Sequence, residues 1–356
     1  MEEFADGKNT PGCASKQYLW RKSQQSLKNM SVLTLGTVAF DTIETPFGSS
    51  GKVVGGAASY IALAVSQFVR KQHLVSVIGE DFPQEFLTEL SGRGTCLNGL
   101  SLVKGGKSLH WSGKYHQDMV QRDTLATDLN VLVGWEPKVC KSGNKADFVM
   151  LGNLDPEVQL AVLDQVNAPQ VVVLDTMNFW MDIAMENLKK VISRVDVLTV
   201  NDEEARQLTG EYFLPKAARA IHKMGPKTVV IKKGEHGALM FQDNKVFFAP
   251  AFPLEEVIDP TGAGDTFAGG FIGYLASRQE ATGEVTWEDM KQAVVVGSVM
   301  ASFTCEAFGT SKLRSLSMVV LSPPGNMRPS SPESSSGFRT RTGVAPKPSM
   351  TLAWAS

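Results

Sequence analysis

The chain has 356 residues, of which 43% are hydrophobic and 20% charged, and this balance is typical of a folded globular protein with a large core. Its formal charge of −2 gives no electrostatic reason to expect a nucleic acid or an anionic membrane as partner. The four cysteines, Cys13, Cys96, Cys140 and Cys305, lie far apart without a CxxC pair, so their spacing suggests neither a zinc site nor a disulfide framework. No apolar run approaches the roughly 20 residues that a membrane span needs. We therefore expect a cytoplasmic protein that acts on small molecules.

The two ends of the chain lack apolar periodicity. Residues 1–30 carry glycine, proline and mixed charges, and residues 321–356 are rich in serine and proline. Such compositions are typical of disordered segments. We expect a disordered leader, one folded domain over 31–320, and a disordered tail.

The folded part begins with a short apolar run, VLTLG, which predicts a buried strand. Asp41 follows it closely. Ligands of open α/β sheets bind beyond the C-terminal ends of strands, so Asp41 is well placed to bind hydroxyl groups, although a turn-forming Asp is the ordinary alternative. Gly55 and Gly56 then precede an Ala-rich helical segment. They permit either close approach to a ligand or close packing of helix on strand.

A strand, a helix and another strand follow, and the pattern then changes. From Lys104 to about Val133, polar and apolar residues alternate between glycines, which predicts a hairpin with one solvated face. We expect a small sheet built from segments at about 42–54 and 100–133, projecting from the main domain. Trp111 and Tyr115 in this hairpin are either ligand or partner contacts or ordinary cross-strand pairs.

The second half is a regular alternation of strands and helices. Four β-branched runs, DFVMLG, VVVLD, DVLTV and TVVIKKG, are separated by segments of helical character. Continuous apolar strands that alternate with helices indicate a mainly parallel sheet covered on both faces, and so an α/β fold. Asn201 and Glu204 follow the third run with the spacing of a helix capping box.

A Gly-rich turn then leads directly into a helix in the stretch DPTGAGDTFAGGFIGYL, which starts at Asp259. The first N–H groups of a helix have no partner within it, and the positive end of its dipole points at the turn, so this junction favours an anion such as phosphate. Asp265 would repel a resting phosphate. Its presence is explained either by helix capping or by a base that takes a proton from an attacking hydroxyl.

The string DPTGAGDTFAGGF closely resembles the C-terminal signature of the ribokinase-like (PfkB) sugar and nucleoside kinases, and the resemblance extends from about Ser31 to Leu316. It implies a mainly parallel sheet flanked by helices, with a small β lid that often forms a dimer surface. It also implies transfer of the ATP γ-phosphoryl group, with Mg²⁺, to a hydroxymethyl group of a sugar, or alternatively of a nucleoside. A non-catalytic nucleotide or sugar sensor on the same fold is another alternative.

The family pattern assigns roles at the acceptor side. In it, Asp265 is the catalytic base, and the amides around Gly262, Ala263 and Gly264 form an anion hole. The acceptor is bound by Asp41, Gly55 and Gly56, and Asn153, beyond the DFVML strand, is a further acceptor contact in our interpretation.

At position 60 the chain departs from the family. Ribokinases proper often have an Asn where Tyr60 stands. An aromatic ring cannot supply the same paired hydrogen bonds, which weakens ribose as the acceptor and leaves stacking on a base open.

The resemblance also assigns a nucleotide side. Asn201 and Glu204 match the N-x-x-E motif that orders Mg²⁺ and phosphate through water, and Mg²⁺ does prefer to keep several waters. Other matching positions are Gly234, Gly237 and Gly309 for the nucleotide, and Asp259 and Thr261 for a monovalent cation, which is K⁺ in potassium-activated members.

Overall fold

A nine-stranded sheet runs through the middle of the protein. The computed structural model describes residues 30–282 and 284–316. The strand order is β13-β12-β11-β10-β9-β8-β1-β4-β5, and the seven strands from β11 to β5 are parallel to one another. These strands are β1 (Val32–Leu35), β4 (Gln72–Gly79), β5 (Thr95–Val103), β8 (Phe148–Leu151), β9 (Val171–Asp175), β10 (Val197–Asn201), β11 (Thr228–Lys232), β12 (Ala238–Gln242) and β13 (Lys245–Ala249).

The central strands are parallel because their residues are apolar on both faces. The strands β1, β8 and β9 are buried along their whole length, so helices must cover both sides of the sheet. The α/β fold that the sequence predicts is confirmed.

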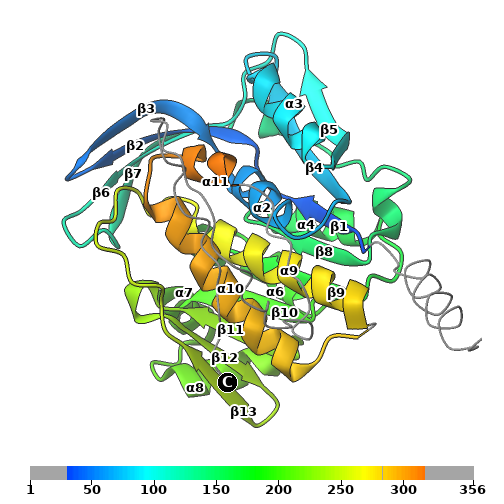
Figure 1. The fold of residues 1–356 in the computed structure, drawn as a ribbon, viewed down its shortest axis with the longest axis vertical. Helices are drawn as coiled ribbons and strands as arrows, with labels where there is room; N and C mark the ends of the chain where they lie inside the picture. The colour runs from blue at the N-terminus through cyan, green and yellow to red at the C-terminus, as the bar shows by residue number, and fades with distance from the viewer. Residues whose placement is uncertain (1–29, 283, 317–356) are drawn as a thin grey trace, which may run out of the picture. The chain divides into compact units, whose positions relative to one another are not determined.

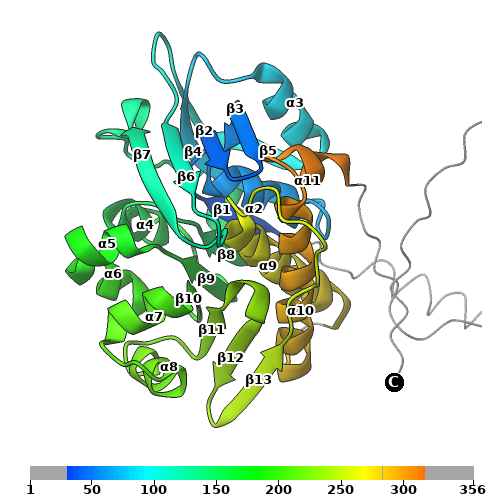
Figure 2. The same cartoon turned by 90° about the vertical axis from the view of Figure 1, so that its left-hand side faces the viewer.

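Two layers of helices cover the sheet (Figures 1 and 2). α2, α9 and α10 pack together on one face, and α4, α6, α7 and α8 lie on the other. The helices are α2 (Ala57–Val65), α3 (Gln84–Gly92), α4 (Pro156–Leu163), α5 (Asn178–Ile183), α6 (Met185–Ile192), α7 (Asp202–Thr209), α8 (Leu214–His222), α9 (Ala263–Thr282), α10 (Trp287–Cys305) and α11 (Ser311–Ser315), with short 3₁₀ turns η1 (Asn130–Leu132), η2 (Gly143–Lys145) and η3 (Gly234–His236).

A second sheet of four strands forms a lid in the order β3-β2-β6-β7. Its strands are β2 (Ala39–Thr45), β3 (Gly48–Gly55), β6 (His110–Tyr115) and β7 (Arg122–Asp128). The predicted hairpin is thus β6–β7, whereas residues up to Val103 extend β5 of the main sheet. Trp111 covers Gly113 and its Nε1 donates to Thr124 Oγ1 at 3.3 Å, so it makes a pair within the lid.

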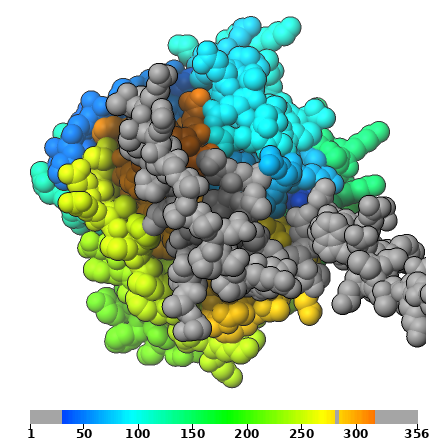
Figure 3. Space-filling view, in the orientation of Figure 1, coloured from blue at the N-terminus to red at the C-terminus, as the bar shows by residue number. Residues whose placement is uncertain are grey.

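The lid strand β3 rests on the turn between α10 and α11. A Cβ on Gly309 would lie 2.9 Å from a methyl carbon of Val53, and a Cβ on Gly48 would lie 3.7 Å from the Phe308 ring. The two segments, blue and orange, are adjacent on the surface in Figure 3. The C-terminal turn of the described chain therefore supports the lid.

The fold brings two cysteines and a histidine together, although their spacing in the sequence suggested no such group. The metal-binding atoms of His73, Cys96 and Cys140 lie within 4.8 Å of one another. Burial alone would raise the pKa of the Cys140 thiol, but hydrogen bonds from Ser142 and from the Gly143 N–H, and the nearby Cys96, hold it below its ordinary value. The separation along the chain concealed this group because parallel pairing of β4 with β5 creates it.

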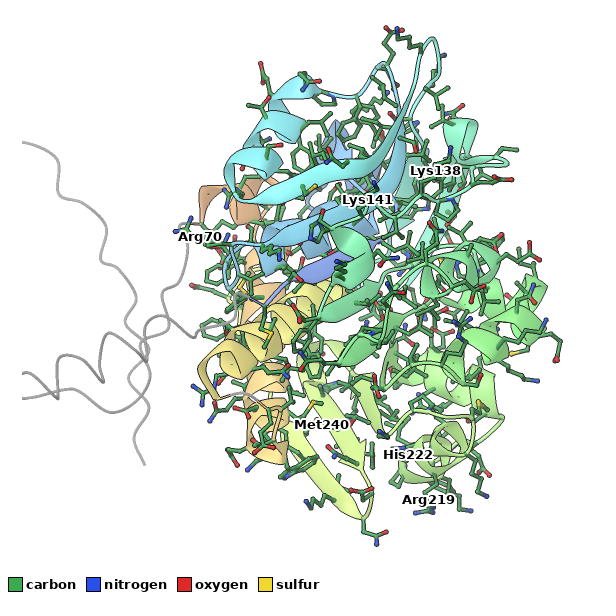
Figure 4. The ribbon with its side chains drawn as sticks, turned by 90° about the vertical axis from the view of Figure 1, so that its right-hand side faces the viewer. Arg70, Lys138, Lys141, Arg219, His222 and Met240 are labelled. Atoms are coloured by element: carbon green, nitrogen blue, oxygen red, sulfur yellow. The ribbon has the colours of Figure 1, made fainter. Side chains whose placement is uncertain are left out.

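This group of side chains lies far from the lid. His73 and Cys96 stand near the starts of β4 and β5, whereas ligands of such sheets bind beyond the strand ends. Lys138 and Lys141, which flank Cys140 in the chain, are labelled in Figure 4 on the side opposite to that of Figure 2.

The predictions of a disordered leader and tail fall almost wholly outside the described residues. Within the described ranges, no helix is long and apolar enough to cross a membrane.

Candidate active site

Polar side chains converge where the parallel strands end and α9 begins. Asp175 is the last residue of β9, Asn201 of β10 and Lys232 of β11. Asp265 stands in the first turn of α9, and Asp41 lies on the lid strand β2. Each of these positions is fixed by a regular element with a buried face, so the side chains are held by the fold rather than by mobile loops.

Asp265 does not cap α9. Its carboxylate makes no hydrogen bond to any other residue in the described part of the chain, so it does not satisfy the N–H groups of its own helix. Burial, and then the negative charge of Asp175, raise its pKa to about 7, against the opposing effect of Lys232. A carboxylate with this pKa accepts a proton near neutral pH far better than an ordinary Asp.

The turn that precedes α9 has the backbone shape of an anion site. Gly262 has φ 77°, and a Cβ there would lie 2.5 Å from the ring of Tyr60, so only glycine fits. The Ala263 N–H donates to Pro260 O at 3.1 Å, which ties one of the three predicted donors into the turn itself. The Gly264 N–H belongs to the first turn of the helix, whose donors have no intrahelical acceptor.

Asp41 is in direct contact with Gly55 and Gly56. The Gly56 N–H donates to Asp41 Oδ2 at 3.4 Å, and a Cβ on Gly55 would lie 1.8 Å from the same oxygen. Gly55 is therefore required by the packing of Asp41, whereas Gly56 is required by its φ of 85° and by the Thr37 carbonyl oxygen, 2.6 Å from where a Cβ would stand. Burial raises the pKa of Asp41 to about 7, although the Gly56 hydrogen bond lowers it.

Tyr60 occupies the centre of the site. The residue is 1% exposed, and its hydroxyl has no hydrogen-bond partner among the residues that the structure describes. Burial and the surrounding carboxylates raise the pKa of this hydroxyl well above its usual value, and those carboxylates belong to Asp41, Asp259 and Asp265. The phenol therefore stays protonated and offers a donor to these groups or to a ligand among them.

Asn201 and Glu204 form a complete capping box on α7. The Glu204 N–H donates to Asn201 Oδ1 at 2.7 Å, and the Asn201 N–H donates to Glu204 Oε2 at 2.8 Å. Burial raises the pKa of Glu204 to about 7, opposed by the nearby Lys232. The capping alternative is thus correct for the local structure, yet a helix cap alone does not require a buried carboxylate.

A buried ion pair lies at this side of the site, and the sequence prediction missed both partners. Lys232 Nζ donates to Asp175 Oδ1 at 2.8 Å, and a Cβ on Gly264 would lie 3.0 Å from the same nitrogen. Burial alone would lower the pKa of Lys232, but Asp175 and Glu204 raise it, so the lysine stays charged. The polar ends of the runs VVVLD and TVVIKKG are the signal that could have identified the pair.

Asp259 connects the turn that precedes α9, here called the anion turn, to the C-terminal part of the fold through hydrogen bonds. It is fully buried, and its two oxygens accept from the Thr261 N–H at 2.8 Å and the Gly309 N–H at 3.1 Å. Thr261 Oγ1 donates to the Tyr115 hydroxyl of β6 at 3.2 Å. Burial raises the pKa of Asp259, which both hydrogen bonds oppose. The Tyr115 contact joins the lid to the turn, so this hairpin aromatic is not an ordinary cross-strand pair.

Three further predicted residues have mainly local contacts. Gly237 has φ 78° and a Cβ there would lie 2.0 Å from Ala249 O, so it allows β13 to approach, while Gly234 has φ 53° with open space around it. Asn153 Oδ1 accepts from Trp180 Nε1 at 2.8 Å, and its Nδ2 donates to the Met177 sulfur at 3.0 Å. Their roles in binding nucleotide or acceptor stay predictions.

The arrangement supports the transfer of a group onto a hydroxyl. The carboxyl groups of Asp41, which is buried, and of Asp265, which is half-buried, lie close enough for the charge of Asp41 to raise the pKa of Asp265. One can hold hydroxyl groups while the other removes a proton. The N–H donors of the turn and Lys232 supply positive potential beside them for an anionic group.

Comparisons with known proteins agree with this geometry. The pattern that defines the pfkB family carbohydrate kinases matches residues 37–315. The chain is 32% identical over 254 residues to a cytidine kinase from Thermococcus kodakarensis, which covers 70% of this chain and 90% of that protein.

Solved structures show the same fold. The nucleoside kinase of Methanocaldococcus jannaschii aligns with a TM-score of 0.63 at 20% identity, covering 78% of this chain and 92% of that one. The ribokinase of Giardia lamblia aligns with a TM-score of 0.65 at 17% identity, covering 80% and 96%.

From the raised pKa of Asp265 we predict how the stability of the protein depends on pH. A carboxyl group with a folded pKa of about 7 and an unfolded value of 3.8 stabilises the fold fully below pH 3.8 and loses that contribution as the pH rises through about 7. Asp265→Asn cannot ionise. We expect the melting temperature of the variant minus that of the native protein to increase by several degrees from about pH 5 to about pH 8, as measured by calorimetry.

The matched control is Asp243→Asn, in the turn between β12 and β13, where φ is 52° and Asn is well tolerated. Its melting temperature should follow that of the native protein at both pH values. If the melting temperatures of Asp265→Asn and the native protein change equally with pH, the raised pKa is contradicted.

Proposed function

Because the chain belongs to the PfkB family of carbohydrate kinases, and so transfers a phosphoryl group from ATP to an alcohol group of a sugar or nucleoside, we propose that its acceptor is a ribonucleoside, phosphorylated on the 5′-hydroxymethyl group. The observation that carries the proposal is the pair of carboxyl groups from two elements, Asp41 on the lid strand β2 and Asp265 in the first turn of α9, which lie close enough for their charges to interact. A ribonucleoside has two vicinal hydroxyls at one end of its sugar and a hydroxymethyl group at the other. Asp41 and Asp265 can contact the vicinal hydroxyls and the hydroxymethyl group at the same time.

In this proposal Asp41 binds the vicinal hydroxyls. A buried carboxylate that accepts only one backbone hydrogen bond retains free acceptor positions. Hydroxyl donors from the substrate would stabilise its charged form, which burial disfavours. The 32% identity to the cytidine kinase supports a nucleoside rather than a free sugar, as does the aromatic Tyr60, which differs from the Asn of ribokinases proper.

Asp265 is then the base. It accepts the proton of the hydroxymethyl group while the oxygen attacks the γ-phosphorus, and the bond from that phosphorus to the β-phosphate oxygen breaks to release ADP. In a loose transition state the proton leaves late, so a base with a pKa of about 7 is sufficient. The free N–H donors of the α9 turn, around Gly262 and Gly264, hold the charge that develops on the transferred group.

The nucleotide side fits a hydrated divalent cation. Glu204 uses one oxygen in the capping box, is buried, and has a raised pKa, so an adjacent cation would stabilise its charged form. Mg²⁺ held through water by Glu204 and Asn201 would offset the charge of the ATP phosphates. Asp259 carries a buried charge beside the anion turn, which is compatible with K⁺.

A homodimer through the lid also remains a proposal. The outer strand β7 is exposed along its whole length and presents Leu125 to solvent. Sedimentation equilibrium would decide it, because a monomeric mass at micromolar concentration would exclude this contact.

The acceptor class can be tested by the release of ADP in the presence of cytidine, 2′-deoxycytidine, ribose and 2-dehydro-3-deoxygluconate. We expect cytidine to be phosphorylated, and 2′-deoxycytidine to react about 10- to 100-fold less efficiently because it lacks one hydroxyl for Asp41. Asp41→Asn should reduce this ratio of kcat/KM values. A free sugar with a higher kcat/KM than every nucleoside would overturn the nucleoside assignment in favour of a sugar kinase.

The base can be tested by Asp265→Asn. We expect kcat to fall by about 10²- to 10⁴-fold, the usual contribution of a positioned base, while ATP still binds in calorimetric titrations. Asp243→Asn again serves as the control. Turnover within a few-fold of the native rate would show that Asp265 is not the base, whereas native ATP binding with no turnover on any acceptor would favour a sensor.

The ions can be tested by replacement. We expect EDTA to abolish turnover and Mg²⁺ to restore it. In the presence of Mg²⁺, K⁺ should raise the rate several-fold above that in Na⁺, and Asp259→Asn should weaken this response. Equal rates in K⁺ and Na⁺ would remove the monovalent site from the proposal.

A further inference from the structure

Four side-chain atoms that can bind a metal ion lie together where the strands β4 and β5 begin. His73 is the second residue of β4 and Cys96 the second of β5, and these two residues pair directly in the parallel register. Residues that are paired across two strands project from the same face of the sheet. The loop between β7 and β8 adds Cys140 and Ser142, and Figure 4 labels Lys141 between them in the chain.

The spacing of these atoms is close to that of the ligands of a small tetrahedral ion. Cys140 Sγ lies 3.9 Å from His73 Nδ1 and 3.4 Å from Ser142 Oγ, and that oxygen lies 3.5 Å from His73 Nδ1. The ligand atoms of His73, Cys96 and Cys140 all lie within 4.8 Å of one another. Zinc bonds of about 2.3 Å to sulfur and about 2.0 Å to nitrogen, at tetrahedral angles, separate two sulfurs by about 3.8 Å and a sulfur from a nitrogen by about 3.6 Å. Side-chain shifts of less than about 1 Å therefore complete the geometry.

The kinds of ligand in the group favour zinc. Thiolates and imidazole are ligands that Zn²⁺ prefers, whereas Mg²⁺ and Ca²⁺ take oxygen ligands. Among the described residues, no carboxylate belongs to this group. Two thiolates also balance the charge of one divalent ion, so the bound site needs no charged neighbour.

The surrounding structure supports the ligands unequally. The Gly143 N–H donates to Cys140 Sγ at 3.3 Å, which favours a thiolate at that position. The ring of His73 is held in the core at 4% exposure, and its Nε2 has no hydrogen-bond partner in the described part of the chain. When Nδ1 binds an ion, Nε2 carries the ring proton. The lack of an acceptor for that proton costs about 10- to 100-fold in metal affinity.

Hydrogen bonding alone explains the group less well. The 3.9 Å between Cys140 Sγ and His73 Nδ1 is long for a hydrogen bond. It also gives no reason for a second thiol beside the same ring. A disulfide between Cys96 and Cys140 would use both sulfurs but would leave the imidazole without a role. A single metal ion uses all three side chains.

We propose that His73, Cys96 and Cys140 bind one Zn²⁺ ion, with its fourth position at the Ser142 hydroxyl. Zn²⁺ displaces the thiol protons, and no covalent bond of the protein breaks.

The ion has a structural role at the edge of the main sheet. β5 is an edge strand of this sheet, and the loop that carries Cys140 runs beside it, since a Cβ on Gly99 would lie 3.4 Å from Lys138 O. Zn²⁺ ties this strand and this loop to β4. The site does not depend on the proposed function, because its ligands stand near the starts of the strands and the candidate active site lies at their ends.

The first experiment titrates the reduced, full-length protein, freed of metal, with Zn²⁺ in competition with a chromophoric chelator. We expect one ion per chain with a Kd on the order of 10⁻⁶ M or lower. Cys96→Ala and Cys140→Ala should each weaken binding by more than about 10²-fold, because a direct ligand contributes more than an outer partner does. Cys305→Ala is the matched control. Burial raises the pKa of the Cys305 thiol to about 12, so its loss should leave the affinity unchanged.

Co²⁺ in place of Zn²⁺ identifies the ligands by absorption spectroscopy. In the native protein we expect the visible bands of a tetrahedral ion and a thiolate-to-cobalt band in the near ultraviolet, and the latter should weaken in both Cys96→Ala and Cys140→Ala. Zn²⁺ at about 100 times its Kd should also raise the melting temperature of the native protein and of Cys305→Ala by a few degrees more than that of Cys140→Ala.

Three results would refute the zinc site. The native protein does not compete with the chelator for Zn²⁺, or Co²⁺ binds without a thiolate-to-cobalt band, or Cys305→Ala loses as much affinity as Cys140→Ala, which would show adventitious binding only. If a cysteine variant fails to fold, the cobalt spectrum of the native protein still decides the question, because the band requires thiolate ligands. None of these measurements uses ATP or an acceptor, so their outcome is separate from that of the kinase assays.

Discussion

The burial of several carboxyl groups around one helix start is the constraint on which the rest of the structure depends. Asp41, Asp265 and Glu204 each have a pKa near 7 because burial disfavours their charge. Such an arrangement destabilises the ionised fold, so the surrounding elements must hold it in place. Parallel strand ends, a capping box and the first turn of α9 do so, each backed by an extensive apolar core. In the proposed function, the hydroxyl donors of the acceptor and a bound cation would stabilise the charged forms of these groups.

Close packing explains why the site is built from glycines. Gly55 leaves room for the Asp41 carboxylate and Gly262 for the Tyr60 ring, with separations of 1.8 and 2.5 Å from where a Cβ would stand. In both cases the glycine makes room for a neighbouring side chain of the site. Packing therefore accounts for these glycines, and close approach of a ligand stays a prediction.

The sequence predicted the fold, and it identified several of the residues that the structure brings together at the start of α9, because both depend on local patterns. β-branched runs specify buried strands, and DPTGAGDTFAGGF specifies a turn, a helix start and a carboxylate in one segment. Lys232 and Asp175 were missed because a charge at the end of an apolar strand has no local partner, and only the adjacency of β9, β10 and β11 pairs them. His73 and Cys96 likewise meet only through the pairing of β4 with β5, and a loop brings Cys140 to them.

The lid is joined to the main domain at two points that lie on opposite sides of the anion turn. Tyr115 binds Thr261, and Val53 packs on Gly309, whose N–H donates to Asp259. Asp259 in turn accepts from the Thr261 N–H, so both lid contacts meet at one buried carboxylate. A shift of either lid strand therefore acts on the turn that precedes Asp265. In the proposed function, this geometry would connect the position of the lid with the shape of the phosphate site. It also gives the fully buried Asp259 a structural role that does not depend on whether a cation binds there.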